Sequence, residues 1–265
     1  MNRFVIKLCL ASFGLAASCA ALAQSFPAKP ITLVVAYAPG GLGDALARTI
    51  AERLTVSLKQ SVLVDNKPGA TGAIATRFVA KANPDGYTLL LGQTGEIVIN
   101  PAVMKDAGYD PNRDLKPVAL VGDSPLVLVA PPSAPFASVR EIAQAAGKSG
   151  VTSYASSGTA TPGHLAAEAM LGALKTPMTH VPYKGAGPAL TDVLGAHVSF
   201  FFSSAGATFG HVRAGKLKAI AVTSSARMAA LPNTPTVAET LPGLNSVCGA
   251  ACSRRPARRT TLWRN

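Results

Sequence analysis

The segment 31–46 joins an apolar strand to a helix through a glycine-rich turn, and it restricts the fold more than any other part of the chain. Its first half is an apolar run rich in β-branched side chains, which is typical of a buried strand. Pro39 and three nearby glycines then end the strand, allow positive φ and leave backbone N–H groups open to a ligand. Apolar residues recur every four positions from Leu42 to Leu58, which predicts an amphipathic helix. Since a helix N-terminus carries unpaired amides and about half a positive charge, the segment predicts an anion site.

The same order of strand, small-residue loop and helix is repeated along the chain. Further strands are predicted at 62–65, 87–91, 118–121, 126–130, 152–155, 178–181, 198–202 and 217–223, and a short helix at 209–214. The loops 92–95 and 156–162 follow two of these strands, and the second opens a helix with Thr161 as N-cap and Pro162 at its first position. Helices that alternate with buried strands favour an α/β fold with mainly parallel sheets. Two lobes are predicted, lobe 1 from 24–124 and 224–245 and lobe 2 from 125–223, with crossings near 122–126 and 223–226.

The N-terminus has the layout of a secretory signal peptide, residues 1–23, with cleavage expected after Ala23. Arg3 and Lys7 precede an apolar stretch, and Ala-Leu-Ala occupies 21–23. No later run reaches the roughly 18 apolar residues that span a bilayer. The mature protein is therefore expected to be soluble outside the cytoplasm. A lipid anchor at Cys19 is a weaker alternative, because no leucine stands three residues before it.

The formal charge of +12 favours acidic ligands but does not demand a nucleic acid partner. Two of the basic residues lie in the leader and five arginines lie after residue 253, so the folded body is less basic than the whole chain. Two of the four cysteines lie in the leader, and Cys248 and Cys252 have no nearby His or Asp to complete a metal site. We therefore expect no disulfide in the folded body, no metal and no cofactor.

Many short motifs, in order over residues 27–244, resemble the Bug family, the substrate-binding receptors of tripartite tricarboxylate transporters. These motifs are Pro-Ala-Lys-Pro-Ile at 27–31, Ala-Pro-Gly-Gly at 38–41 with Asp44, Asn-Lys-Pro-Gly-Ala at 66–70, Pro-Asp-Gly-Tyr-Thr-Leu-Leu at 84–90, His-Val-Pro-Tyr-Lys-Gly at 180–185, Pro-Ala-Leu-Thr-Asp at 188–192, Ala-Gly-Lys-Leu at 214–217 and Pro-Thr-Val-Ala-Glu at 235–239. The resemblance implies a two-lobed, type II-like periplasmic binding protein that closes on a small carboxylate. It also implies a monomer that delivers its ligand to integral-membrane transporter subunits and has no catalytic residue.

The resemblance further implies which residues hold the ligand, and they come from four loops. The set is Tyr37, Pro39, Gly40, Gly41 and Asp44; Thr94 and Gly95; Ser156, Ser157, Thr159, Thr161 and His164; and Tyr183, Lys184 and Gly185. Other interpretations stay open: the glycine loop could be a turn that binds nothing, Asp44 could only stabilise the helix dipole, His164 could be structural, and Lys184 could lie on a solvated rim. A dinucleotide site is disfavoured, because Leu46 stands where the third glycine belongs.

The segment 246–265 departs from the pattern, with five arginines, two cysteines and no hydrophobic periodicity, and we expect no regular structure there. The family usually continues past Gly243 with elements that complete lobe 1. We therefore interpret 246–265 as a basic tail foreign to the family, read in a shifted frame, and lobe 1 as incomplete.

Two other functions stay open. One is a secreted α/β enzyme that acts on a carboxylic acid through His164 or His180, although the chain has no Gly-x-Ser-x-Gly motif. The other is a non-functional remnant of the receptor.

Overall fold

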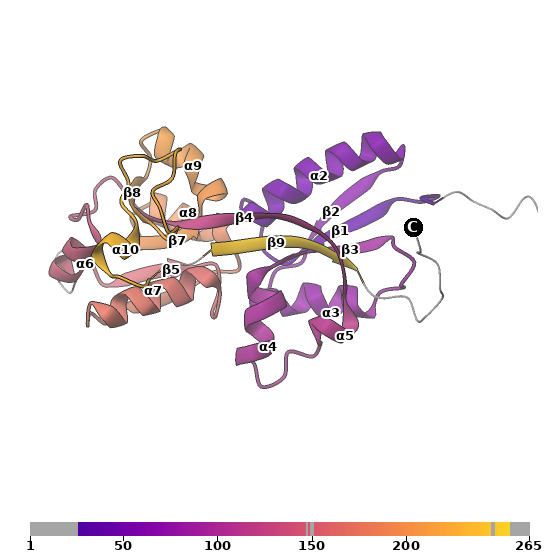
Figure 1. Cartoon of the computed structure of the whole chain (residues 1–265), viewed down its shortest axis with the longest axis horizontal. Helices are drawn as coiled ribbons and strands as arrows, with labels where there is room; N and C mark the ends of the chain where they lie inside the picture. The colour runs from indigo at the N-terminus through magenta and orange to yellow at the C-terminus, as the bar shows by residue number, and fades with distance from the viewer. Residues whose placement is uncertain (1–25, 147, 149–150, 245–246, 255–265) are drawn as a thin grey trace, which may run out of the picture.

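The computed structural model describes residues 26–146, 148, 151–244 and 247–254, which form two α/β lobes joined by long strands (Figure 1). The predicted leader, its cleavage site after Ala23 and Cys19 lie outside the described residues. Within the described part of the chain, no helix is long and apolar enough to cross a membrane.

The first lobe is built on three parallel strands in the order β2–β1–β3. Side chains of β1 alternate between the two faces, so that Leu33 packs under α2 and Val34 packs under α3. The predicted strand, glycine turn and helix of 31–46 are confirmed, whereas the predicted loop 92–95 is instead the end of β3 and the start of a short helix. The elements are β1 (Ile31–Val35), α2 (Leu42–Leu58), β2 (Val62–Asn66), η1 (Ala70–Gly72), α3 (Ala73–Lys81), β3 (Thr88–Gln93), η2 (Gly95–Ile99), α4 (Asn100–Val103) and α5 (Pro111–Asp114).

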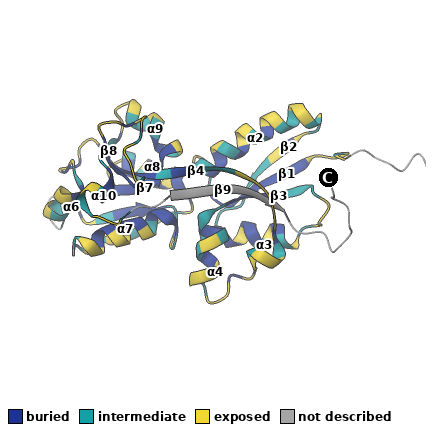
Figure 2. Ribbon diagram, viewed as in Figure 1, coloured by how far each residue is buried: buried dark blue, intermediate teal, exposed yellow. Residues whose placement is uncertain are grey.

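The second lobe has a second parallel core, in which β5 pairs with both β6 and β7. Phe200 and Phe202 pack towards α7, and Phe201 packs towards α8 on the opposite face. Figure 2 shows this arrangement as dark blue strands between helices whose outer faces are exposed. The elements are α6 (Val139–Ala145), β5 (Ser153–Ser156), α7 (Pro162–Ala173), β6 (Thr179–Pro182), α8 (Ala186–Leu194), β7 (Phe200–Ser204), α9 (Ala205–Arg213), β8 (Lys218–Val222) and α10 (Val237–Thr240).

A single long strand, β4 (Lys116–Ala130), runs from one lobe into the other (Figure 1). The prediction of two strands, at 118–121 and 126–130, is therefore wrong in separating them. The crossing between lobes was predicted near 122–126, and the strand continues through it. Residues 116–125 pair with β9, and two register shifts in that ladder absorb the irregular positions. Residues 126–130 pair with β7 and β8 of the second lobe.

The strand β9 (Val247–Arg254) lies between β3 and β4 and runs antiparallel to both. The expectation of no regular structure after residue 245 is wrong for these eight residues. Two strand edges offer rows of N–H and C=O groups, and a segment can pair with them without any hydrophobic periodicity. The sheet is consequently mixed: the predicted parallel pairs form the core of each lobe, and every antiparallel pair among the described strands involves β4 or β9.

Candidate functional site

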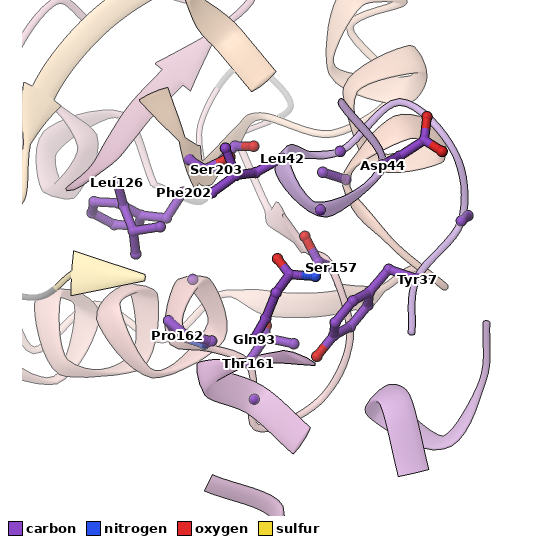
Figure 3. A pocket seen from close by; sticks show the side chains of 17 residues that line it. Tyr37, Leu42, Asp44, Gln93, Leu126, Ser157, Thr161, Pro162, Phe202 and Ser203 are labelled. Carbon is purple, nitrogen blue, oxygen red and sulfur yellow. The ribbon is translucent and has the colours of Figure 1, made fainter. Parts of the chain in front are cut away.

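Two adjoining cavities lie between the lobes and share Tyr37 and Ser157. Cavity 1, drawn in Figure 3, has a volume of about 550 Å³ with its opening to solvent included, and cavity 2 has about 510 Å³. Cavity 1 is lined from the first lobe by Tyr37, Ala38, Gly41, Leu42, Gly43, Asp44, Gln93 and Gly95, and from the second lobe by Leu126, Ser157, Thr161, Pro162, Gly163, Ala186, Phe202, Ser203 and Ser204. Cavity 2 is lined by Tyr37, Gly69, Ala70, Thr71, Gly72, Ser157, Gly158, Thr159, Pro182, Tyr183 and Lys184.

In the described part of the chain, four α-helices begin at cavity 1, and none of them has a side-chain hydrogen bond that closes its N-terminus. These helices are α2, α7, α8 and α9, with N-cap residues Gly41, Thr161, Gly185 and Ser204. Thr161 occupies the predicted N-cap position, but its hydroxyl donates instead to the carbonyl oxygen of Gly158 at 2.8 Å. Among the other described α-helices, α5, α6 and α10 are capped by side chains, whereas α3 and α4 are not.

The uncapped helix N-termini make cavity 1 attractive to an anion. Each leaves first-turn N–H groups without an intrahelical partner and carries about half a positive charge. Among the described residues that line cavity 1 there is no lysine or arginine, and Lys184 lines cavity 2 instead. The positive potential at cavity 1 therefore comes from main-chain dipoles, which bind carboxylates and phosphates in many proteins.

Asp44 lines cavity 1, but its carboxylate is engaged within the first lobe. One oxygen, Oδ2, accepts hydrogen bonds from Gly40 N and Arg48 Nε, both at 3.1 Å, and Oδ1 lies 3.0 Å from Arg48 Nη2. Burial acts to raise the pKa of Asp44, but hydrogen bonds from Arg48, Gly40 and Asn66 outweigh it and lower the pKa. Asp44 is thus an ionised residue that holds the glycine loop in shape.

The loop 156–161 is held from behind by a stack of aromatic rings. Ser156 is fully buried, and its Oγ lies 2.6 Å from His180 Nε2 and donates to Gly158 O at 2.9 Å. The rings of His164 and His180 stack with centroids 4.0 Å apart, and Tyr154 stacks on His180 at 5.0 Å. Burial lowers the pKa of both histidines. Neither histidine lines cavity 1 or cavity 2, so this half-buried cluster supports the loop from the second lobe.

The two lobes touch around the cavities through direct hydrogen bonds. Ala38 N donates to Lys184 O at 2.9 Å, and Thr71 Oγ1 donates to Thr159 O at 2.8 Å. Gly187 packs on the carbonyl oxygen of Pro39 so closely that a Cβ there would clash with it. The structure is therefore a form in which the lobes are closed over the space between them.

A family model described as the tripartite tricarboxylate transporter family receptor matches residues 46–250. This chain belongs to that receptor family. The solved structure of the periplasmic binding protein BugD is 34% identical, with a TM-score of 0.83, over 89% of this chain and 79% of BugD. Rpa4515 of R. palustris, solved with adipate, is 33% identical with a TM-score of 0.84, over 89% of this chain and 80% of its own. MatC (Rpa3494) from Rhodopseudomonas palustris, solved with bound malate, is 30% identical with a TM-score of 0.82, over 88% of this chain and 80% of its own.

These similarities confirm the α/β periplasmic-binding-protein fold and the receptor class that the motifs predicted. The alternative of a secreted enzyme acting through His164 or His180 is wrong, since the family consists of solute-binding receptors. The structure agrees with this correction, because Ser156, which contacts His180, is fully buried.

Most predicted site residues of this receptor lie at the two cavities. Cavity 1 is lined by Tyr37, Gly41, Asp44, Gly95, Ser157 and Thr161, and cavity 2 by Tyr37, Ser157, Thr159, Tyr183 and Lys184. The others line neither cavity: they are Pro39, Gly40, Thr94, Ser156, His164 and Gly185. Gly185 packs against Ala38, and Ser156 and His164 hold the loop 156–161, so these three shape the site from behind. Contact of any of these residues with a ligand remains a prediction.

The contribution of β7 and α9 to cavity 1 was not predicted from the sequence. Phe202, Ser203 and Ser204 line it, and Ser203 Oγ is buried without a hydrogen-bond partner among the described residues. The helix predicted at 209–214 begins in fact at Ala205, directly after the strand. The Ser-Ser pair that follows the apolar run 198–202 was the available signal, since it marks one more junction of strand and helix.

Proposed function

We propose that this receptor captures a small carboxylate between its lobes for uptake through the membrane subunits of a tripartite transporter. The observation that carries the proposal is the convergence of four uncapped helix N-termini on cavity 1. Adipate in Rpa4515 and malate in MatC support a carboxylate as the ligand class.

The number of donors around cavity 1 is sufficient for useful affinity. Micromolar binding requires about −8 kcal/mol, after several kcal/mol have been lost to restricted motion. Each hydrogen bond to a charged group contributes roughly 1.5 to 3 kcal/mol. Four or five main-chain and hydroxyl donors therefore reach the required range, but only if both lobes contribute.

Binding then follows a simple order in this proposal. The carboxylate first meets the α2 N-terminus and the glycine loop of the first lobe. The loop 156–161 and the α7 N-terminus of the second lobe close over it, and the contacts Ala38 to Lys184 and Thr71 to Thr159 form around the ligand. The closed receptor is the form that the membrane subunits recognise.

The proposal includes export and a monomeric receptor. Cleavage after Ala23 gives a mature periplasmic protein that begins at Gln24. Mass spectrometry of a periplasmic extract measures the N-terminus directly, and sedimentation of the purified protein measures its oligomeric state. A mature chain that starts elsewhere, or a stable dimer, contradicts these parts of the proposal.

The deciding experiment is a thermal-shift screen of the purified mature protein with acetate, succinate, adipate, malate and citrate, followed by calorimetric titration of each. A ligand stabilises the folded state in proportion to its affinity and concentration. We expect at least one carboxylate to raise the melting temperature and to bind with micromolar affinity. A folded protein that binds none of the five contradicts the proposal, and a protein that does not stay soluble supports the non-functional remnant.

A variant at Gly41 locates the site. Valine there places two methyl groups near Ala186, whose Cβ is 3.4 Å from a Cβ built at 41, and so fills the entrance to the α2 N-terminus. We expect Gly41→Val to abolish carboxylate binding while its circular dichroism stays that of the parent. Gly172→Val is the matched control, because a Cβ at 172 meets nothing within 4 Å. Parental affinity in Gly41→Val places the ligand elsewhere.

A further inference from the structure

A fully buried carboxyl group, that of Glu96, lies directly behind the lining of cavity 1. Tyr37 Oη donates to Glu96 Oε2 at 2.9 Å, and Gln93 N donates to Glu96 Oε1 at 2.7 Å. Tyr37 and Gln93 both line cavity 1, and Figure 3 shows their side chains near Ser157 of the other lobe. Glu96 therefore bonds the side chain of Tyr37 and the backbone of Gln93, two residues that the first lobe presents to the ligand space.

The groups packed around Glu96 supply hydrogen bonds but no opposite charge. The Tyr109 hydroxyl donates to the backbone oxygen of Glu96, and Gly72 leaves room beside Oε2, where a Cβ would stand at 3.1 Å. On α3, the Arg77 side chain donates a hydrogen bond to Ala107 O. Burial raises the pKa of Tyr109, and the charge of Arg77 only partly offsets this rise. On α2, Asp44 is already paired with Arg48. Burial raises the pKa of Glu96 to about 7, against the hydrogen bonds from Gln93, from its own N–H and from Tyr37.

We propose that Glu96 is a positioning residue that couples carboxylate binding in cavity 1 to the uptake of one proton, through its hydrogen bond with Tyr37. This inference rests on the function proposed above and adds a pH dependence to it.

The coupling follows from which partner donates the hydrogen bond. When Glu96 is ionised it only accepts, so the Tyr37 proton points at Oε2 and the phenol presents lone pairs towards the cavity. A ligand carboxylate is then repelled by those lone pairs and by the buried charge. When Oε2 carries a proton, Glu96 donates to Tyr37 Oη, and the phenolic O–H turns to donate to the ligand. One proton from solvent ends on Oε2, and no covalent bond other than its O–H is formed.

Of the four histidines, His164 and His180 hold the loop 156–161, and they do not contact Glu96. Because burial lowers the pKa of both, they titrate below Glu96. A substitution at Glu96 that leaves the second lobe unchanged separates the two contributions.

The test compares the parent with Glu96→Gln in calorimetric titrations at about pH 6.5 and pH 8.0, with the five carboxylates of the screen. Affinity scales with the population of the competent state, so a group with a pKa of about 7 makes the parent bind about eightfold more weakly at the higher pH. Glutamine has the shape of protonated glutamate, because its NH₂ donates to Tyr37 and its oxygen accepts from Gln93 N. Glu96→Gln should therefore keep the low-pH affinity, within about twofold, at both pH values.

Two further measurements sharpen the result. At about pH 7.5 the binding heat of the parent should depend on the ionisation enthalpy of the buffer, because a proton is taken up, and that of Glu96→Gln should not. Glu52→Gln, an exposed residue of α2, is the matched control and should keep the parental pH profile. Ionisation of the ligand itself is common to all three proteins and cancels in the comparison. Tyr37→Phe removes the hydroxyl that accepts the hydrogen bond of protonated Glu96, so it should bind more weakly and show a smaller pH dependence than the parent. It replaces Glu96→Gln if that variant does not fold.

The outcomes separate this inference from the proposed function. Two results would overturn the role of Glu96 and leave the carboxylate receptor intact. In one, the parent binds with no pH dependence. In the other, the parent and Glu96→Gln bind with the same pH profile. A folded parent that binds none of the five carboxylates at either pH overturns the proposed function, and the inference with it.

Discussion

The hydroxyl of Thr71 in the first lobe donates a hydrogen bond to the carbonyl oxygen of Thr159 in the second, over 2.8 Å. These residues are 88 positions apart in the chain and lie on the two sides of cavity 2. Because the bond joins the two lobes, it stabilises this closed arrangement.

Replacement of Thr71 by valine, which has the same shape and β-branching, should weaken ligand binding by about two- to fivefold. This corresponds to about 0.5 to 1 kcal/mol for a single exposed hydrogen bond. The loss should appear as faster ligand dissociation in stopped-flow measurements, because the bond forms at closure. Thr49→Val is the control, since its hydroxyl bonds only Ala45 O within α2. Equal effects of the two variants contradict a role for Thr71 in closure.

The raised pKa of Glu96 also predicts how the stability of the unliganded protein depends on pH. Its pKa is about 7 in the folded state against an ordinary value of 4.5, so the folded state binds the proton more tightly than the unfolded state. The contribution to the free energy of unfolding is fully present below about pH 4.5 and is lost as pH rises through 7, by on the order of 3 kcal/mol in total. Urea unfolding between about pH 5 and pH 8 measures this slope. Glu96→Gln should reduce the slope of the unfolding free energy against pH. An unchanged slope contradicts a buried Glu96 carboxyl with a raised pKa.

Replacement of Ser203 by alanine should have opposite effects on the stability of the free protein and on its affinity for the ligand. Its hydroxyl is buried in the wall of cavity 1 without a partner among the described residues, which costs about 1 to 3 kcal/mol in the free protein. Ser203→Ala should therefore leave the unliganded protein as stable as the parent, or more stable by about 1 kcal/mol in urea unfolding. If the hydroxyl serves the carboxylate, affinity should fall by about tenfold in calorimetry.

The matched control for this variant is Ser224→Ala, because the Ser224 hydroxyl bonds Ala226 O in an exposed turn away from the cavities. A loss of stability in Ser203→Ala without a loss of affinity assigns its hydroxyl to the fold and not to the ligand.

The junctions of strand and helix could be predicted because their signals are local. The segment around Gly41 and that around Thr161 each combine an apolar run, small residues and a periodic helix within about fifteen positions. Sheet order and the position of β9 between β3 and β4 depend instead on pairing between distant segments. Backbone pairing leaves no side-chain pattern, so a strand of small and basic residues between β3 and β4 gave no signal.

Glu96 shows the same limit for the site. In the sequence it follows a Gln-Thr-Gly loop, where a glutamate is normally exposed, and it was not recognised as a site residue. Its burial is produced by Tyr37, 59 positions earlier, and by Tyr109, 13 positions later. Tertiary packing therefore decides both its environment and its pKa. The start of α9 was missed for a local reason, because glycine and alanine after Ser204 gave no apolar periodicity.

The packing of α7 on β7 predicts opposite effects for two glycines of the same helix. Gly163, in the first turn beside cavity 1, is pressed against the carbonyl oxygen of Phe202, which a Cβ would meet below any normal contact distance. Gly172, in the last turn, meets nothing within 4 Å. Gly163→Ala should lower the free energy of unfolding by about 1 to 3 kcal/mol and weaken carboxylate binding, because it pushes the helix N-terminus away from the cavity. Gly172→Ala should raise the free energy of unfolding by about 0.5 to 1 kcal/mol and leave binding unchanged. Urea unfolding and calorimetry of the pair measure both quantities, and equal stability of the two variants shows that the α7 N-terminus is not held against β7.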